Sequence, residues 1–257
     1  VVTPRKDLAT HFDQWYAKRA GQDTVPVVLV TSQGGGVRSA YWTAQVLSEL
    51  QTTFPNFSDY TYAYSGVSGG SLGVGTFKTR VKAQQTSLRE KSHHILSQDF
   101  LSPITSWLVI PDLVQKFLPF PVYAVDRAKA LEYSWEKASE MDTASLLQEG
   151  FLNAWQQDES VVIFNATRVE NGFRTLVSNV QTPPTIFHRT EDFFKVVEND
   201  IRLSTAISVS ARFPFITPPA EIESNGKQWG HLVDGGYVEN MGAASLLELY
   251  RFIAQRA

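Results

Sequence analysis

The sequence predicts an α/β fold in which a mainly parallel sheet carries helices on both faces. Two observations support this prediction. Short β-branched or aromatic runs alternate with longer segments of helical periodicity, and two glycine clusters lie where such a run ends and a helix begins. Strands that alternate with helices are typical of crossover units that cover a sheet on both sides. The 257 residues suit one large domain of this class or two small ones.

The first elements follow this alternation. Residues 7–20 have the pattern of a polar amphipathic helix, and residues 25–30 form a short apolar run rich in β-branched side chains. Such a run indicates a buried strand. Three glycines follow it, and from Val37 onward apolar side chains recur at helical spacing. The first glycine cluster is therefore predicted to lie on a strand-to-helix turn.

The second glycine cluster repeats this arrangement. Residues 60–64 are aromatic and favour a strand, and residues 66–77 continue with a glycine-rich turn and helix. The helix would contain four glycines within about two turns, and each costs roughly 1 kcal/mol relative to alanine. We therefore expect this helix to pack very close to another segment, or its turn to require a positive φ.

The remaining elements are predicted from the same patterns. The middle of the chain is mostly helical, and a hairpin and two terminal helices follow it. In order, we expect helices within 82–157 around a proline-broken apolar stretch at 100–125, strands at 160–167 and 173–180 joined by a turn at 170–172, a helix of small residues at 203–211, a strand end at 231–233, and an amphipathic helix at 243–254.

Composition excludes several classes of function. Cysteine is absent, which excludes disulfides, a thiol nucleophile and thiolate metal sites. The net charge of -3 and the absence of a basic stripe give no indication of nucleic-acid binding. No segment approaches the roughly 18 uncharged apolar residues of a membrane span. The chain begins at Val1 without a signal-peptide pattern, so we interpret it as a processed protein or an excised soluble domain.

A candidate nucleophile stands in the pentad Gly66-Val67-Ser68-Gly69-Gly70. A G-x-S-x-G pentad places serine on a sharp strand-to-helix turn, with its hydroxyl free of the backbone. The helix that begins behind Ser68 adds a positive dipole end, which favours a developing alkoxide. The pentad arises by chance in roughly one chain of this size in ten, so the flanking strand and helix carry the interpretation. The alternative is a flexible glycine turn.

The three consecutive glycines Gly34, Gly35 and Gly36 offer backbone N–H groups at a helix N-terminus. Such groups can cradle a phosphate or hold an oxyanion. A phosphate-binding loop would need Gly-Lys-Ser/Thr, and a dinucleotide turn would need G-x-G-x-x-G; neither is present. We therefore predict an oxyanion hole, to which Gly69 also contributes. Arg38 would hold this loop or meet an anionic head group, although a surface arginine on a tight turn is the plainer interpretation.

Asp234 is a candidate general base, and the sequence leaves two arrangements open. In a typical α/β-hydrolase triad the order is serine, acid, histidine, but no histidine follows Asp234. Either Asp234 acts directly on Ser68, with burial raising its pKa, or Ser68 forms a triad with Asp200 and His231. Without the other two clusters, the pair Asp234-Gly235 would be interpreted as an ordinary turn, because Asp-Gly is common in turns. The isolated pair His93-His94 lacks a third ligand at a sensible spacing, so we predict no metal site.

Together, the three clusters resemble the patatin-like phospholipase family. That family carries a G-G-G-x-R/K loop, a G-x-S-x-G elbow and a D-G-G/A motif in this order. Residues 34–38, 66–70 and 234–236 match these motifs. Residues 204–214 also resemble the family's helix of small residues that ends in proline. The similarity runs from about Val25 to the C-terminus and is weakest over residues 82–157.

The resemblance implies a three-layer α/β/α sandwich that forms a single domain over residues 1–257, with 82–157 as a helical insertion or cap. It implies a Ser68–Asp234 dyad that cleaves acyl esters of lipids without a histidine, a cofactor or a metal. Many members carry aspartate before the glycine triplet, where this chain has Ser32-Gln33. The implied site comprises the catalytic pair Ser68 and Asp234, the oxyanion hole of Gly34, Gly35, Gly36 and Gly69, and the supporting residues Arg38, Gly66, Gly70, Gly235 and Gly236.

The expected partners are a lipid or acyl-ester substrate and a membrane surface. Some bacterial members join such a domain to membrane helices, which suits a chain that begins in mid-sequence. Residues 100–125 and 213–216 could line an acyl channel or touch a membrane, but contiguous apolar residues are more often core. A lipid-binding domain without turnover is the alternative outside the enzymes.

Overall fold

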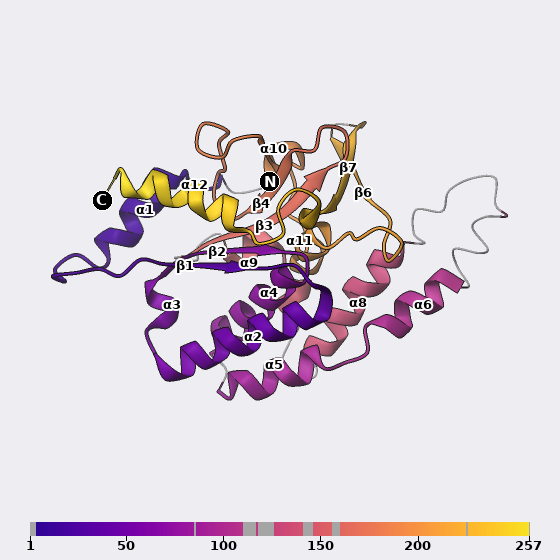
Figure 1. Cartoon of the computed structure of the whole chain (residues 1–257), viewed down its shortest axis with the longest axis horizontal. Helices are drawn as coiled ribbons and strands as arrows, with labels where there is room; N and C mark the ends of the chain where they lie inside the picture. The colour runs from indigo at the N-terminus through magenta and orange to yellow at the C-terminus, as the bar shows by residue number, and fades with distance from the viewer. Residues whose placement is uncertain are drawn as a thin grey trace.

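A computed structural model describes residues 4–84, 86–109, 117, 126–140, 146–155, 160–224 and 226–256. A central sheet lies between two groups of helices (Figure 1). Helices α2 (Gly36–Thr53) and α4 (Gly69–Lys82) cover one face, and helices α1 (Leu8–Ala17) and α12 (Ala243–Ala254) cover the other. The predicted three-layer α/β/α arrangement is therefore confirmed.

The sheet is mixed. Strands β1, β2 and β3 run parallel to one another, and β4 and β7 run antiparallel to β3 on its two edges. Strand β5 is parallel to β4, and β6 pairs with β7 as an antiparallel hairpin. The strands are β1 (Val28–Ser32), β2 (Thr61–Val67), β3 (Val161–Arg168), β4 (Arg174–Ser178), β5 (Thr190–Asp192), β6 (Ala220–Ser224) and β7 (Lys227–Asp234).

Alternate residues of the central strands enter two separate hydrophobic clusters. Val162 and Phe164 of β3 pack with α2 and α4, whereas Val161 and Ile163 pack with α1 and α12. Successive side chains of a strand point to opposite faces of a sheet, so a strand buried on both sides must be apolar throughout. This requirement explains the unbroken apolar start of β3 and the near-complete burial of β2.

Close packing of two helices explains the glycines after β2. A Cβ added at Gly69 would lie 1.9 Å from the Gly36 carbonyl oxygen, and one at Gly73 would lie 2.6 Å from that of Ala40. Helix α4 thus lies against α2 at a distance that only glycine permits. The expectation of unusually close packing is confirmed.

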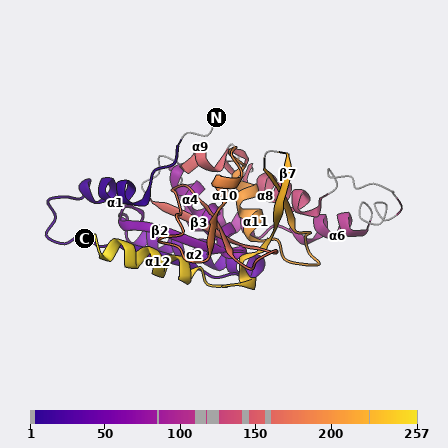
Figure 2. The same ribbon diagram turned by 90° about the horizontal axis from the view of Figure 1, so that it is seen from above.

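The remaining helices extend the layer formed by α2 and α4. Helix α5 packs on α2, α6 packs on α8, and α8 packs on α11. Figures 1 and 2 place α6 at the opposite end of the molecule from α1 and the C-terminus. These helices are α3 (Phe57–Tyr60), α5 (Leu88–Leu96), α6 (Leu101–Val109), α8 (Arg127–Glu140), α9 (Phe151–Trp155), α10 (Phe193–Val196) and α11 (Leu203–Ser210).

The apolar stretch predicted at 100–125 is described only at residues 100–109 and 117. Within it, Phe100 and Ile104 are buried, whereas Leu101 is exposed. The described part therefore supplies both core and surface. Over the residues that the structure describes, no helix combines the length and the apolar character needed to cross a membrane.

Candidate active site

Strand β3 brings the ends of two distant strands together. Val67, the last residue of β2, pairs with Asn165, and Asp234, the last residue of β7, pairs with the next residue, Ala166. The opposite edge of β3 is occupied by β4 over the same residues, so β2 and β7 share one edge and approach it from opposite directions. Ser68, which follows Val67, is thereby brought to Asp234.

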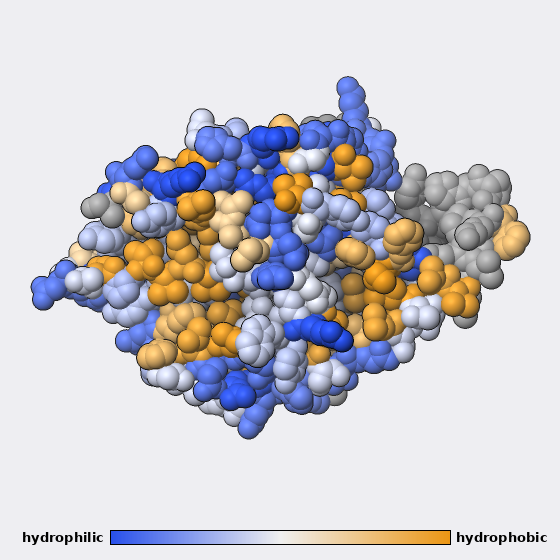
Figure 3. Space-filling model, in the orientation of Figure 1, coloured by the Kyte–Doolittle hydropathy of each residue, from blue (hydrophilic) through white to orange (hydrophobic). Residues whose placement is uncertain are grey.

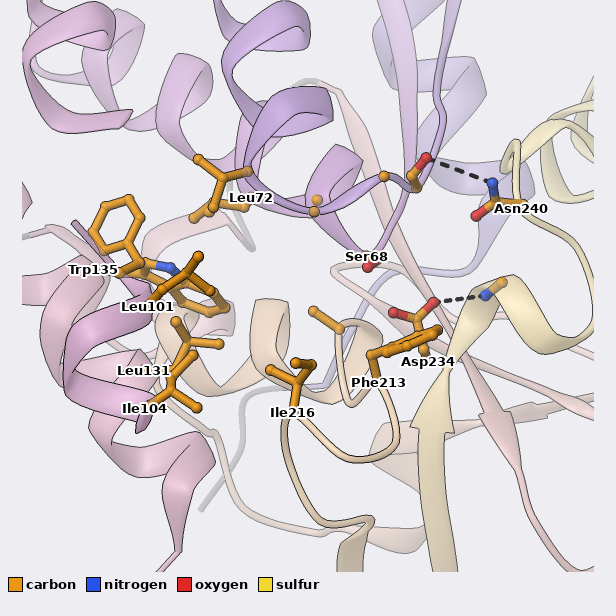
Figure 4. Close-up of a pocket in the computed structure, with 18 of the residues that line it drawn as sticks. Ser68, Leu72, Leu101, Ile104, Leu131, Trp135, Phe213, Ile216, Asp234 and Asn240 are labelled. Carbon is orange, nitrogen blue, oxygen red and sulfur yellow. Dashed lines mark hydrogen bonds between the residues drawn. The ribbon is translucent and has the colours of Figure 1, made fainter. Parts of the chain in front are cut away.

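Ser68 lies on the sharp turn that the pentad predicts. It is the N-cap of α4 and has φ 53° and ψ -123°, a left-handed value of φ that is uncommon for a residue with a side chain. Strain of this kind is typical of a nucleophile elbow, where serine projects from a strand-to-helix turn. The Ser68 and Asp234 side chains both line one pocket and lie near each other in Figure 4.

Burial governs the charge of Asp234, which is only 4% exposed. Removal from water raises the pKa of its carboxyl group above the ordinary value, while hydrogen bonding from the Ser68 hydroxyl and the Gly236 amide lowers it. Figure 4 draws the bond from the Gly236 amide, which is 2.8 Å long. The carboxyl group thus lies beside the Ser68 hydroxyl, whose proton a general base would accept.

The first glycine loop lies beside Ser68. Gly34, Gly35 and Gly36 line the pocket with Gly69, and Gly36 has a left-handed φ of 60°. The Gly34 amide donates to the Asn240 carbonyl at 2.9 Å. The Gly34 amide therefore anchors the loop and is not available to an oxyanion. This finding corrects the prediction that Gly34 donates to the oxyanion hole. The amides of Gly35, Gly36 and Gly69 are the candidates that lie at this edge of the pocket.

The supporting glycines permit close backbone approach. A Cβ at Gly66 would lie 2.7 Å from the Ser71 Cα, and one at Gly70 would lie 2.2 Å from the Ser32 carbonyl oxygen. Gly235 approaches the Asn165 carbonyl oxygen equally closely. Arg38 stands exposed in the first turn of α2, consistent with either interpretation given for it above.

An apolar wall faces this polar edge across a cavity of about 750 Å³. Leu131 and Trp135 come from α8, and Leu101 and Ile104 come from α6 (Figure 4). Leu72 of α4 lies on the same side. The cavity thus has Ser68 and Asp234 at one end and apolar side chains at the other, an arrangement suited to a ligand with a long hydrocarbon part.

The alternative triad is not assembled. His231 is held by Glu170, with its Nδ1 2.9 Å from the Glu170 Oε1, and its side chain is 39% exposed. Asp200 accepts the amides of Leu152 and Asn153 at the start of α9. Both residues are therefore engaged away from Ser68, and the prediction of a Ser68–Asp200–His231 triad is wrong.

The pair His93-His94 lies in the last turn of α5. His93 bonds to the Tyr41 hydroxyl at 2.8 Å. In the described part of the chain, no three His, Cys, Asp or Glu side chains gather as a metal site.

Three residues beside the site gave no usable signal in the sequence. Asn240 binds Gly34, Ser210 binds the Ser68 amide, and Asn165 pairs with the end of β2. Ser210 belongs to the small-residue helix that resembles the family, but nothing in that pattern indicates which serine faces the nucleophile. These contacts depend on tertiary structure.

An α/β sheet with a serine on a strained turn and a buried acid beside it defines a hydrolase-like architecture. The family model of the patatin-like phospholipases matches residues 30–247. The chain therefore belongs to the patatin-like phospholipase family. A comparison with curated proteins gave no significant match.

Several solved structures are similar to this chain at low sequence identity, and one of them shares its fold with a TM-score above 0.5. Human GIVD cytosolic phospholipase A2 is similar with a TM-score of 0.54 and 14% identity, over 93% of this chain and 44% of that one. The complex of the same enzyme with methyl gamma-linolenyl fluorophosphonate has a TM-score of 0.49 and 16% identity, over 93% of this chain and 41% of that one. VipD from Legionella pneumophila has a TM-score of 0.37 and 13% identity, over 84% of this chain and 46% of that one. The chain spans less than half the length of each of these proteins.

Proposed function

We propose that this protein is a lipid acyl hydrolase that uses Ser68 as nucleophile and Asp234 as general base. The observation that carries the proposal is the register of β3, whose consecutive residues Asn165 and Ala166 hold the ends of β2 and β7. Membership of the patatin-like phospholipase family and the fold shared with a phospholipase A2 support the class of substrate.

In the proposed reaction, Asp234 accepts the hydroxyl proton of Ser68 as its oxygen attacks the carbonyl carbon of the ester. The amides of Gly35, Gly36 and Gly69 would stabilise the oxyanion, and each such donor is typically worth 10²–10³ in rate. Collapse of the intermediate breaks the ester bond, and the proton on Asp234 passes to the leaving alcohol. The product of this first half-reaction is an acyl ester of Ser68.

In the second half, Asp234 accepts a proton from water, which attacks the acyl-serine carbonyl. The second tetrahedral intermediate then releases the fatty acid, and the proton returns to Ser68. Burial supports the role of Asp234 because a carboxylate whose pKa is raised is a stronger base at neutral pH.

The apolar wall of the cavity would hold the acyl chain. Helices α6 and α8 supply much of that wall, so we propose that residues 82–157 form a cap on a single hydrolase domain. Apolar side chains gather at the end of the molecule where α6 lies (Figure 3). Phe213 and Ile216 line the pocket and are partly exposed, and the neighbouring Phe215 is 92% exposed. These residues support a lipid surface as the partner.

The test compares Ser68→Ala with wild type on p-nitrophenyl butyrate and with a fluorophosphonate label. We expect Ser68→Ala to lose turnover and labelling while its thermal midpoint stays close to that of wild type. The matched control is Ser224→Ala on β6, which removes a hydroxyl bonded to the carbonyl of Val196 in α10. Full turnover by Ser68→Ala would refute the proposal, and a wild type that binds lipid without turnover would favour the non-catalytic alternative.

A further inference from the structure

The end of helix α11 binds the backbone of both proposed catalytic residues. The Ser68 amide donates to the Ser210 hydroxyl at 3.0 Å and lies 3.2 Å from the Ser210 carbonyl oxygen. Two residues further on, the Arg212 carbonyl accepts the Asp234 amide at 3.0 Å. One short segment thus holds the nucleophile from one strand and the base from another.

The Ser210 hydroxyl is fully buried and uses all of its hydrogen-bonding capacity. It donates to the Asn165 carbonyl at 2.6 Å. It also lies 2.9 Å from the Ser71 hydroxyl and accepts the Ser68 amide. A hydroxyl group has one proton to donate and two lone pairs, so with its proton on Asn165 it accepts from Ser71 and from Ser68. Its orientation is therefore fixed.

These bonds connect three elements at the elbow. Asn165 lies on β3 and pairs with Val67, the residue before Ser68. Ser71 lies in the first turn of α4, directly after the elbow. The Ser210 hydroxyl consequently joins the strand below the elbow, the strained residue itself and the helix behind it.

The segment is anchored in turn by a buried arginine. The Arg212 guanidinium pairs with Asp126 at 2.8 Å and donates to the Pro218 carbonyl at 3.3 Å. The Arg212 side chain is 7% exposed, and charge-assisted bonds in such surroundings are strong and directional. The end of α11 is thereby fixed independently of the Ser68 elbow.

We propose that Ser210 is a positioning residue that fixes the strained backbone of Ser68 and so aims its hydroxyl. The inference rests on the proposed function of Ser68. Without the Ser210 hydroxyl, the Ser68 amide loses its shorter bond and the left-handed conformation loses a stabilising contact. A displacement of about 1 Å at a reacting atom can cost about 10² in rate. The bond also occupies the Ser68 amide, which leaves the following amide, that of Gly69, for the oxyanion.

The test measures kcat and KM separately for Ser210→Ala and Ser204→Ala on p-nitrophenyl butyrate. Ser204 is the matched control because it is fully buried in the same helix and bonds to Glu136 at 2.5 Å, away from the elbow. We expect Ser210→Ala to lower kcat by about 10- to 100-fold with KM within about twofold. Ser204→Ala should keep kcat within about threefold, although it too removes a buried, hydrogen-bonded hydroxyl from α11.

A second variant keeps the inference testable if Ser210→Ala does not fold. Ser71→Ala removes one partner of the Ser210 hydroxyl and leaves its bond to the Ser68 amide, so we expect kcat to fall about 3- to 10-fold at unchanged KM. If Ser210→Ala does fold, the losses of activation free energy in the double variant Ser71→Ala/Ser210→Ala should not add, since both residues act through one network.

Equal losses of kcat in Ser210→Ala and Ser204→Ala would overturn the positioning role. If Ser210→Ala does not fold, an unchanged kcat in Ser71→Ala would overturn it instead. The rate of fluorophosphonate labelling reports the same geometry without turnover. These outcomes differ from failure of the proposed function, in which the wild type itself would neither turn over the ester nor label at Ser68.

Discussion

Gly235 lies so close to Asn165 that an added Cβ would stand 2.3 Å from the Asn165 carbonyl oxygen. The end of β7 can therefore reach the end of β2 only because residue 235 lacks a side chain. The contact is with backbone, which cannot swing aside as a flexible side chain can. The glycine after Asp234 is thus a geometric condition for the proposed catalytic pair.

We expect Gly235→Ala to lower kcat at least about 100-fold, because the required shift would move Asp234 by a substantial fraction of 1 Å. Gly236→Ala is the comparison, since its nearest contact is the Asn240 side-chain oxygen at 2.9 Å. It should lose less activity than Gly235→Ala. Esterase kinetics and thermal midpoints of both variants test this prediction. A larger loss of kcat in Gly236→Ala than in Gly235→Ala would contradict it.

The pH dependence of kcat/KM should follow the ionisation of Asp234. A base must be deprotonated to act, and burial raises the pKa of this carboxyl. On the acid side of that pKa, we expect activity to fall about tenfold per pH unit. The fall should begin at a higher pH than the ordinary aspartate value of about 3.9 would give. A profile that stays flat down to that ordinary value would exclude Asp234 as the base.

The free energy of unfolding should change with pH in the opposite direction to kcat/KM, falling where the activity rises. Because the folded pKa of Asp234 is raised, the folded state binds this proton more tightly than the unfolded chain does. The free energy of unfolding therefore decreases as pH rises from about 3.9 through the folded pKa. Asp234→Asn removes this penalty, so its thermal midpoint relative to wild type should be higher at pH 7 than at low pH. Parallel melting curves at all pH values would contradict the prediction.

Histidine 231 should be dispensable for catalysis. It pairs with Glu170 on a half-exposed surface, so His231→Ala should keep kcat/KM within about threefold, since such surface pairs are worth little. Asp234→Asn should lose about 10²–10⁴-fold, the usual contribution of a general base. Ester hydrolysis by the two variants, measured side by side, distinguishes a dyad from a triad that uses this imidazole.

Chain-length selectivity should depend on the far wall of the cavity. Ile104 lies on that wall and is buried, so Ile104→Trp should exclude about two methylene groups of a long acyl chain. At about 0.8 kcal/mol for each buried methylene, kcat/KM for a laurate ester should fall roughly tenfold while that for a butyrate ester changes little. Ile104→Leu is the volume-matched control. Equal losses on both esters would place the acyl chain elsewhere.

Binding to lipid vesicles should depend on the exposed loop beside the pocket. Phe215 has a positive φ of 68° and is 92% exposed, so inserting its ring into a bilayer would bury much apolar surface. We expect Phe215→Ser to reduce cosedimentation with phosphatidylcholine vesicles about 10-fold, from roughly 1.5 kcal/mol of lost burial. Phe54→Ser, which alters an exposed ring at the end of α2, should bind as wild type does. Equal binding by both variants would exclude this loop as the contact.

Much of the fold could be predicted from local patterns. Helix α12 begins and ends at the predicted residues 243 and 254, and β3 and β4 form the predicted hairpin. Strand β1 begins three residues later than predicted, directly after Pro26-Val27, because proline lacks the N–H group that a ladder needs. The three residues of β5 are too few to give a periodic signal.

The site was predictable in its parts but not in its assembly. The elbow and the glycine loop are local turns whose glycines mark them in the sequence. That Asp234 meets Ser68 depends on β7 sharing an edge of β3 with β2, a pairing that no local pattern encodes. The bond from the Gly34 amide to Asn240 is equally long-range, so the correction to the oxyanion hole required the tertiary structure.

The shared edge of β3 has a consequence for biosynthesis. A nascent chain that has emerged as far as β3 already holds the segments needed to align β1, β2 and the bend after β2, since domains tend to fold from the N-terminus during translation. Asp234 arrives only with β7, which follows β2 and β3 in the sequence, and such non-local pairing forms late. If Asp234 is the base that we propose, the serine elbow forms before its partner reaches it, and a nascent chain that lacks β7 should be inactive on esters.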